Sequence, residues 1–126
     1  MEAKKVDKIV NIFKKRILTP ILYMVENEDV VDLICFCDKN MDIKTLYDTT
    51  IELEKETGLQ FEITDIREFC EEERVDIVSS ATLLYSEDKI IEMIFTKSML
   101  EDYGKMIKKR SEMLIRYEEN HSPYLQ

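Results

Sequence analysis

The stretch of residues 21–37, ILYMVENEDVVDLICFC, decides the fold. Two short apolar runs, 21–25 and 30–37, lie on either side of an acidic turn at 26–29. Runs this short that are rich in Val, Ile and aromatic residues are typical of buried strands, because a helix needs a longer apolar stripe. The stretch therefore predicts two central strands of a sheet, joined by the turn.

One charged residue, Asp32, interrupts the second run. A buried carboxylate costs several kcal/mol unless it has hydrogen-bonding partners or lies at the solvated end of its strand. Two interpretations of Asp32 follow. In the first, it is a strand-end carboxylate bonded to backbone amides or to a neighbouring Lys or Arg. In the second, it binds a metal ion or another ligand.

The composition is that of one globular domain spanning residues 1–126. Hydrophobic residues make up 44% of the chain and charged residues 36%, which provides apolar side chains for a single core. The formal net charge of −9 argues against general nucleic-acid binding, which depends on clustered Lys and Arg. No apolar run reaches transmembrane length, and the first residues lack the apolar region of a signal peptide. We therefore expect a cytoplasmic protein that does not bind membranes.

The three cysteines are expected to be reduced thiols, since their number is odd and no export signal is recognisable. Cys35 and Cys37 lie two apart on a strand and share a face, a geometry that disfavours a disulfide. No second Cys/His pair is present to complete a zinc site. We expect both residues to be small members of the core.

The remaining elements follow from periodicity and from start and stop signals. Residues 3–17 carry one apolar stripe at helical spacing. Gly58 ends the second helix, because a left-handed C-terminal position is one that glycine fills at little cost. Asp65 and Glu68 have the spacing of a capping box, which predicts the start of a third helix.

The expected helices span 3–17, 43–57, 65–79 and 87–118, the last with a candidate break near 96–98, and the expected strands span 21–25, 30–37, 59–64 and 82–85. This order predicts a mixed α/β (α+β) fold. In it, helices pack on a small mixed sheet and a long helix ends the chain.

Three stretches carry a family resemblance: 30–34 (VVDLI), 58–64 (GLQFEIT) and 82–85 (TLLY). Together with the order of elements, they resemble the minimal nucleotidyltransferases of the DNA polymerase beta superfamily. These are small bacterial proteins that are often paired as antitoxins with an all-helical partner. The resemblance implies that 30–34 lies where the family has Asp-x-Asp-Leu, and that 58–64 carries the third carboxylate.

The chain departs from that family pattern at the residues that handle the nucleotide. Val25-Glu26 stands where the family has Gly-Ser, and Val30 stands where it has the first metal-binding Asp. Asp32 and Glu62 remain as candidate catalytic or metal ligands. Two-metal phosphoryl transfer needs several converging carboxylates, so two are a poor substitute.

Further features weaken the predicted nucleotide site. The only glycines, Gly58 and Gly104, lie outside the hairpin, so no glycine-based phosphate cradle is expected there. Asp29 is three residues from Asp32, which on a continuous strand places it on the opposite face. The plainer interpretation of Glu62 is an outward-facing residue of an edge strand, because it alternates with apolar neighbours.

The predicted C-terminal helix carries an apolar face wider than one edge of a small sheet requires. Three of its members are Met, a residue that suits adaptable contact surfaces. The face packs on the protein's own sheet or mediates self-association or partner binding, and both alternatives stay open. Its members are Met99, Leu100, Tyr103, Met106, Ile107, Arg110, Met113, Leu114 and Tyr117.

Three hypotheses about function follow. The first is a catalytically degenerate nucleotidyltransferase fold that binds another protein, as an antitoxin-like or scaffold subunit, with no cofactor. The second is an active but atypical nucleotidyltransferase that uses a magnesium nucleotide, with missing ligands supplied by a partner chain or by residues 26–29. The third is a nucleotide-binding module without chemistry. Loss of the Gly-Ser step and of the first Asp favours the first hypothesis.

Overall fold

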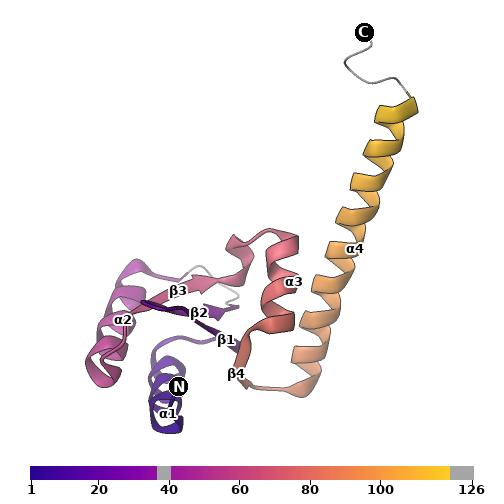
Figure 1. Ribbon diagram of the computed structural model, residues 1–126. Helices are drawn as coiled ribbons and strands as arrows, with labels where there is room; N and C mark the ends of the chain where they lie inside the picture. Colours follow the sequence, from indigo (N-terminus) through magenta and orange to yellow (C-terminus); the bar gives the residue numbers. More distant parts are fainter. Residues whose placement is uncertain (37–40, 120–126) are drawn as a thin grey trace.

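A computed structural model describes residues 1–36 and 41–119 of the chain, and its elements follow the predicted order (Figure 1). They are α1 (Ala3–Arg16), β1 (Ile21–Glu26), β2 (Val31–Cys35), α2 (Ile43–Thr57), β3 (Phe61–Asp65), the short 3-10 helix η1 (Ile66–Glu68), α3 (Glu71–Ser80), β4 (Thr82–Ser86) and α4 (Lys89–Glu119). The predicted mixed α+β fold with a long C-terminal helix is confirmed.

The hairpin predicted from residues 21–37 forms the centre of a four-stranded sheet with the order β3-β2-β1-β4. β1 is antiparallel to both β2 and β4, whereas β2 and β3 are parallel. The predicted edge position of residues 82–85 is confirmed, since β4 has a single neighbour. β2 ends at Cys35, and Cys37 lies outside the described residues.

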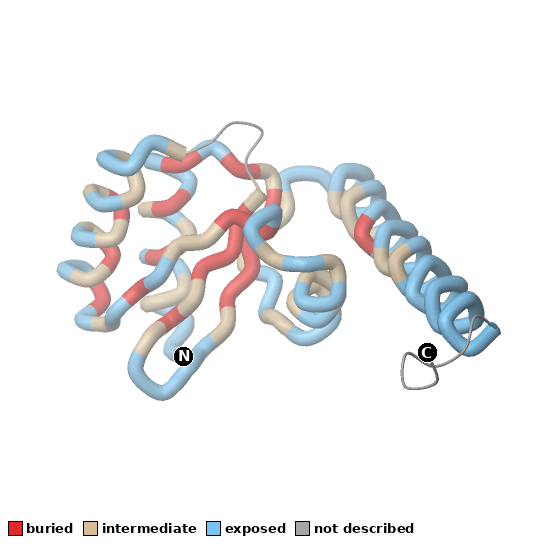
Figure 2. The backbone as a smooth tube through the Cα atoms, turned by 90° about the horizontal axis from the view of Figure 1, so that it is seen from above, coloured by how far each residue is buried: buried red, intermediate tan, exposed pale blue. Residues whose placement is uncertain are grey.

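The sheet separates two layers of helices. On one face, the fully buried Ile9 and Phe13 of α1 and Leu53 of α2 pack against Leu22 and Leu33 of the central strands. Figure 2 shows that buried residues concentrate in the strands and on the inner sides of the helices. An exposed ion pair between Arg16 Nε and Glu52 Oε2, 2.6 Å apart, also joins α1 to α2.

The second face of the sheet is covered by α3 and α4. Tyr23 and Ile34 form its centre, together with Ile66 of η1 and Met99 of α4. The pKa of Tyr23 is raised, first because burial disfavours the phenolate and second because of the nearby Glu92 carboxylate. This packing fixes the first half of α4 against the sheet.

The predicted start of the third helix at Asp65 is wrong. The Asp65 side chain does act as a cap, since Oδ1 accepts the backbone N–H of Arg67 at 2.9 Å. The element it begins is the three-residue η1, and α3 starts only at Glu71. A cap satisfies the first free N–H groups of a 3-10 turn as well as those of an α-helix, so the spacing alone does not distinguish them.

The predicted break near 96–98 is also wrong, because α4 is continuous over 31 residues, about 46 Å. Phe95 and Met99, on either side of the expected break, both belong to the second core cluster. Their packing holds this part of the chain helical. Residues 107–119 are exposed on every side, and Figure 1 shows this half of α4 extending away from the rest of the molecule. No helix in the described ranges is apolar enough over a sufficient length to cross a bilayer.

Candidate functional site

The β1–β2 turn is the position at which the resemblance described above implies a phosphate-binding step. Residues 27–30 close the hairpin, and the backbone N–H of Asn27 donates to the carbonyl of Val30 at 3.0 Å. Glu28 and Asp29 are exposed. Because Asp29 belongs to the turn and not to β2, the alternation of a strand does not decide where its side chain lies, contrary to our expectation.

Asp32 is the second residue of β2 and is half-buried. Its Oδ2 accepts a hydrogen bond from Nδ2 of Asn27 at 2.7 Å. The expected position near a strand end agrees with the structure, but the expected partners do not. The partner is different from the predicted backbone amide or cation, because it is a side-chain amide from the adjacent turn.

The parallel pairing of β2 with β3 places Asp32 directly beside Glu62. Directly paired residues of neighbouring strands project to the same face of a sheet, so the two carboxylates share a face. Val25 of β1 occupies the paired position on the other side of Asp32. Glu62 is exposed on the edge strand β3, the position expected from its alternation with apolar neighbours. The sequence does not predict that the two carboxylates lie side by side.

These residues do not fit the two-metal centre that phosphoryl transfer requires. Among residues 1–36 and 41–119, no three His, Cys, Asp or Glu side chains come together in a way that would hold a metal ion. Gly58 has φ +75° and caps α2, and its N–H is bonded to the carbonyl of Glu54 at 2.8 Å. Its amide is therefore already used, and Gly104 lies within α4.

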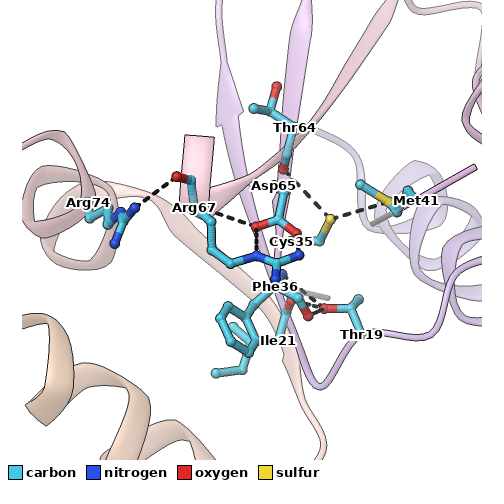
Figure 3. A network of polar contacts seen from close by, with 9 residues as sticks. All are labelled: Thr19, Ile21, Cys35, Phe36, Met41, Thr64, Asp65, Arg67 and Arg74. Carbon is cyan, nitrogen blue, oxygen red and sulfur yellow. Dashed lines mark hydrogen bonds and ion pairs between the residues drawn. The ribbon is translucent and has the colours of Figure 1, made fainter. Parts of the chain in front are cut away.

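A polar network lies at the opposite ends of β2 and β3 (Figure 3). Asp65, at the end of β3, is buried and accepts hydrogen bonds from Arg67 Nε at 3.0 Å and Nη2 at 2.8 Å. The Arg67 guanidinium also lies 5.5 Å from the centre of the Phe36 ring. Arg74 donates to the carbonyls of Arg67 and Phe69 and thereby ties α3 to η1. Asp65 was predicted to be a cap, but its pairing with Arg67, which the Asp-x-Arg spacing indicates, was not predicted.

Thr19 forms a second part of this network. Its buried hydroxyl contacts the carbonyls of Ile21 and Phe36 and accepts the Phe36 N–H at 3.1 Å. It therefore joins the start of β1 to the end of β2. Within the described part of the chain, every buried side-chain nitrogen and oxygen has a hydrogen-bonding partner. The internal bonds of this network give it a structural role.

The predicted interaction face of α4 is partly packed on the protein's own fold and partly exposed. Met99 belongs to the core, and Tyr103 and Met106 are half-buried, so these residues pack toward the protein's own fold. The other six members are exposed: Leu100, Ile107, Arg110, Met113, Leu114 and Tyr117. The exposed Arg110 places Nη2 3.6 Å from the sulfur of Met106.

Additional apolar side chains are exposed beside the first half of α4. A groove of about 870 Å³ runs between this helix and the ends of the central strands. Leu18, Ile91 and Ile94 line it and are all exposed, Leu18 to 88%. Exposed apolar residues that gather on one surface indicate protein contacts more often than scattered ones do.

Comparison by sequence gives no match to a protein family and none to a curated protein. Comparison by structure gives toxin–antitoxin complexes. A chain of the MntA–HepT complex is 13% identical, with a TM-score of 0.73 over 91% of this chain and 97% of that one. A chain from the complex of a tri-AMPylated Shewanella oneidensis HEPN toxin with MNT antitoxin is 13% identical, with a TM-score of 0.74 over 92% and 98%. A chain of a toxin–antitoxin structure with AMP-PNP is 12% identical, with a TM-score of 0.70 over 88% of this chain and 96% of that one. The chain therefore has the minimal nucleotidyltransferase fold.

Proposed function

We propose that this protein is an antitoxin-like subunit that works by binding another protein and has lost nucleotidyl transfer. The proposal rests on one combination of features. An almost complete nucleotidyltransferase fold, similar to chains of toxin–antitoxin complexes over about nine-tenths of its length, carries an altered hairpin. That hairpin has Val30 in place of a metal ligand and keeps only Asp32 on β2.

The electrostatics of the turn support loss of nucleotide binding. A triphosphate carries about four negative charges and needs free backbone amides, cations or bridging metal ions to hold it. The turn instead exposes Glu28 and Asp29, and the N–H of Asn27 is used within the turn. The Asn27 side chain, in turn, is engaged with Asp32. Glu28 and Asp29 would repel a bound phosphate, and the backbone and side-chain N–H groups of Asn27 already have hydrogen-bonding partners.

We expect magnesium nucleotides to bind weakly or not at all. Isothermal titration calorimetry with ATP, GTP, CTP and UTP, each with Mg²⁺ or Mn²⁺, measures this directly. The Asp32→Asn variant should change the free energy of unfolding by no more than about 0.5 kcal/mol, because an asparagine oxygen still accepts the hydrogen bond from Asn27. Glu62→Gln is tested beside it, because it neutralises the other candidate ligand, the exposed carboxylate paired with Asp32.

The outcomes separate the three hypotheses. Micromolar nucleotide binding that both Asp32→Asn and Glu62→Gln abolish would overturn the degenerate site and support an enzyme. Binding that survives both substitutions would indicate a nucleotide-binding module without metal chemistry.

The active alternative has one observation in its favour. Asp32 and Glu62 share a face of the sheet, as two ligands of a metal centre must. In that case, the remaining ligands come from a partner chain or from residues 26–29. Calorimetry repeated on the complex with the partner tests this alternative, because ligands supplied in trans are present only there.

We expect the partner to be a small all-helical protein of the kind in the similar complexes, encoded beside this chain. Its contact surface is the groove beside the first half of α4, with the exposed Ile91 and Ile94 that line it. Co-expression of the two genes should give a stable complex on size-exclusion chromatography. The variant Ile91→Glu, in the groove, should lose the complex, whereas Ile51→Glu, on an exposed position of α2, should keep it. A complex unaffected by Ile91→Glu would place the contact elsewhere.

A further inference from the structure

A second surface of α4, separate from the stripe that packs on the rest of the fold, has residues at the spacing of a coiled coil. Its residues follow each other at alternating spacings of three and four, and all are exposed. We call them the outer seam: Ile90, Met93, Lys97, Leu100, Gly104, Ile107, Ser111, Leu114 and Glu118. One seam position of each heptad is apolar throughout (Met93, Leu100, Ile107 and Leu114), whereas the other carries Ile90, Lys97, Gly104, Ser111 and Glu118.

The outer seam is not used by the protein's own fold. The residues of α4 that are buried or half-buried form a different stripe, which includes Phe95, Met99, Tyr103 and Met106. Five of the nine seam positions carry large apolar side chains that are 40–66% exposed. These apolar side chains contribute to stability only when another helix covers them and removes them from water.

Gly104 lies at the middle of the seam and has no function within the chain. Glycine inside a helix is less stable than alanine, because it loses more conformational freedom on folding. A Cβ atom built at Gly104 would have no heavy atom of the surrounding described structure within 4 Å. The fold itself therefore does not require a glycine here. Close approach of another helix backbone does require one.

The seam is complementary to itself in the antiparallel direction, with Gly104 as the centre. Residues at nearly equal distances before and after Gly104 then face each other in two copies. This pairs Leu100 with Ile107 of the second copy and Met93 with Leu114 of the second copy. Gly104 meets itself on the two-fold axis, where the two backbones come closest.

Charge complementarity selects the same arrangement. Beside the seam, Glu101 lies three residues before Gly104 and Lys108 lies four residues after it. An antiparallel pair therefore places Glu101 opposite Lys108 of the second copy, twice in each dimer. A parallel pair would instead place Lys97 against Lys97, a like-charge contact on the seam. In the antiparallel dimer the apolar pairs between Met93 and Leu114 and the Glu101–Lys108 pairs match, whereas Ile90 of one copy meets Glu118 of the other at each end of the seam.

We propose that two copies of this chain form an antiparallel dimer through the outer seam of α4, with the helices crossing at Gly104. The contact is isologous, since the same surface of each copy is used. The inference deepens the proposed function and rests on it, because it takes α4 as a protein-binding surface and names the occupant of its outer side. The groove on the other side of α4 remains available to a different protein.

The test is the mass of the purified full-length chain by sedimentation equilibrium, without any partner present. We expect a dimer for the wild type. Glu101→Lys and Lys108→Glu each create two like-charge contacts per dimer and should raise the dissociation constant by about tenfold or more. The double variant Glu101→Lys/Lys108→Glu restores opposite charges and should return the dissociation constant toward the wild-type value.

Two further variants separate loss of the dimer from loss of the fold. Lys109→Glu changes the charge as much as Lys108→Glu does. Because Lys109 lies on the side of α4 away from the outer seam, this variant should leave the dimer intact. Gly104→Glu places two carboxylates face to face at the crossing point and should give a monomer whose circular dichroism retains the full helical signal, because glutamate favours helices more than glycine does.

A monomeric wild type, or single charge variants that the double variant does not rescue, would overturn the dimer. Neither result affects the proposed function, since the complex with a helical partner depends on Ile91 and the groove. Conversely, a dimer that forms no such complex would leave the outer seam established and the antitoxin-like function unsupported. The two proposals therefore fail separately.

Discussion

Replacing Phe13 by alanine is expected to lower the free energy of unfolding by about 3–5 kcal/mol, the largest single effect we predict. Phe13 is fully buried in the core cluster between α1, α2 and the sheet. Removing its ring loses the transfer free energy of the ring and leaves a cavity that rigid strands do not fill. Urea denaturation followed by circular dichroism measures the change.

Leu18→Ala is the control for this measurement. Leu18 follows the same helix but is 88% exposed, so its loss should change stability by about 0.5 kcal/mol or less. If Phe13→Ala proved as mild as Leu18→Ala, α1 would not be packed on the sheet as described, and the first core layer would need revision.

Asp65→Ala is expected to lower the free energy of unfolding by about 1–3 kcal/mol. The substitution removes the cap of η1 and both side-chain bonds to Arg67. The estimate is below that for a fully buried ion pair, because the Arg67 side chain is 39% exposed and regains water when the carboxylate is lost. Thermal or urea unfolding provides the measurement.

Asp65→Asn gives a matched comparison, because its carbonyl oxygen still caps Arg67 while the charge is removed. It should lose less stability than Asp65→Ala. Equal losses for the two variants would mean that the charge, and not the cap, provides the stability. A loss below about 0.3 kcal/mol for both would contradict the structural role of this network.

The elements of the fold were predictable because their signals are local. The two apolar runs of 21–37, the glycine at the end of α2 and the short run at 82–85 each gave an element of the right type in the right order. The two errors have a common cause. The cap at Asp65 and the polar residues at 96–98 are local signals whose outcome depends on what packs nearby. Around 96–98, Phe95 and Met99 are held on the second core face, which keeps α4 helical.

The candidate site was predictable in its residues but not in its geometry. Asp32 and Glu62 were identified from their positions in apolar strands. Their placement side by side depends on the register of a parallel strand pair whose members are thirty residues apart in the chain. No local pattern sets that register. The partner of Asp32 was missed for a similar reason, since the reach of Asn27 depends on the shape of the turn.

The order of the strands also affects how the chain folds during its synthesis. The two central strands are synthesised first, and both of their outer neighbours come later, so the emerging hairpin has two open edges. β4 covers the free edge of β1 only after more than fifty further residues have been made. Unpaired strand edges recruit other chains, and long loops close slowly. Chains interrupted before β4 should therefore be prone to aggregate, so that completion of β4 and protection from aggregation are coupled during synthesis.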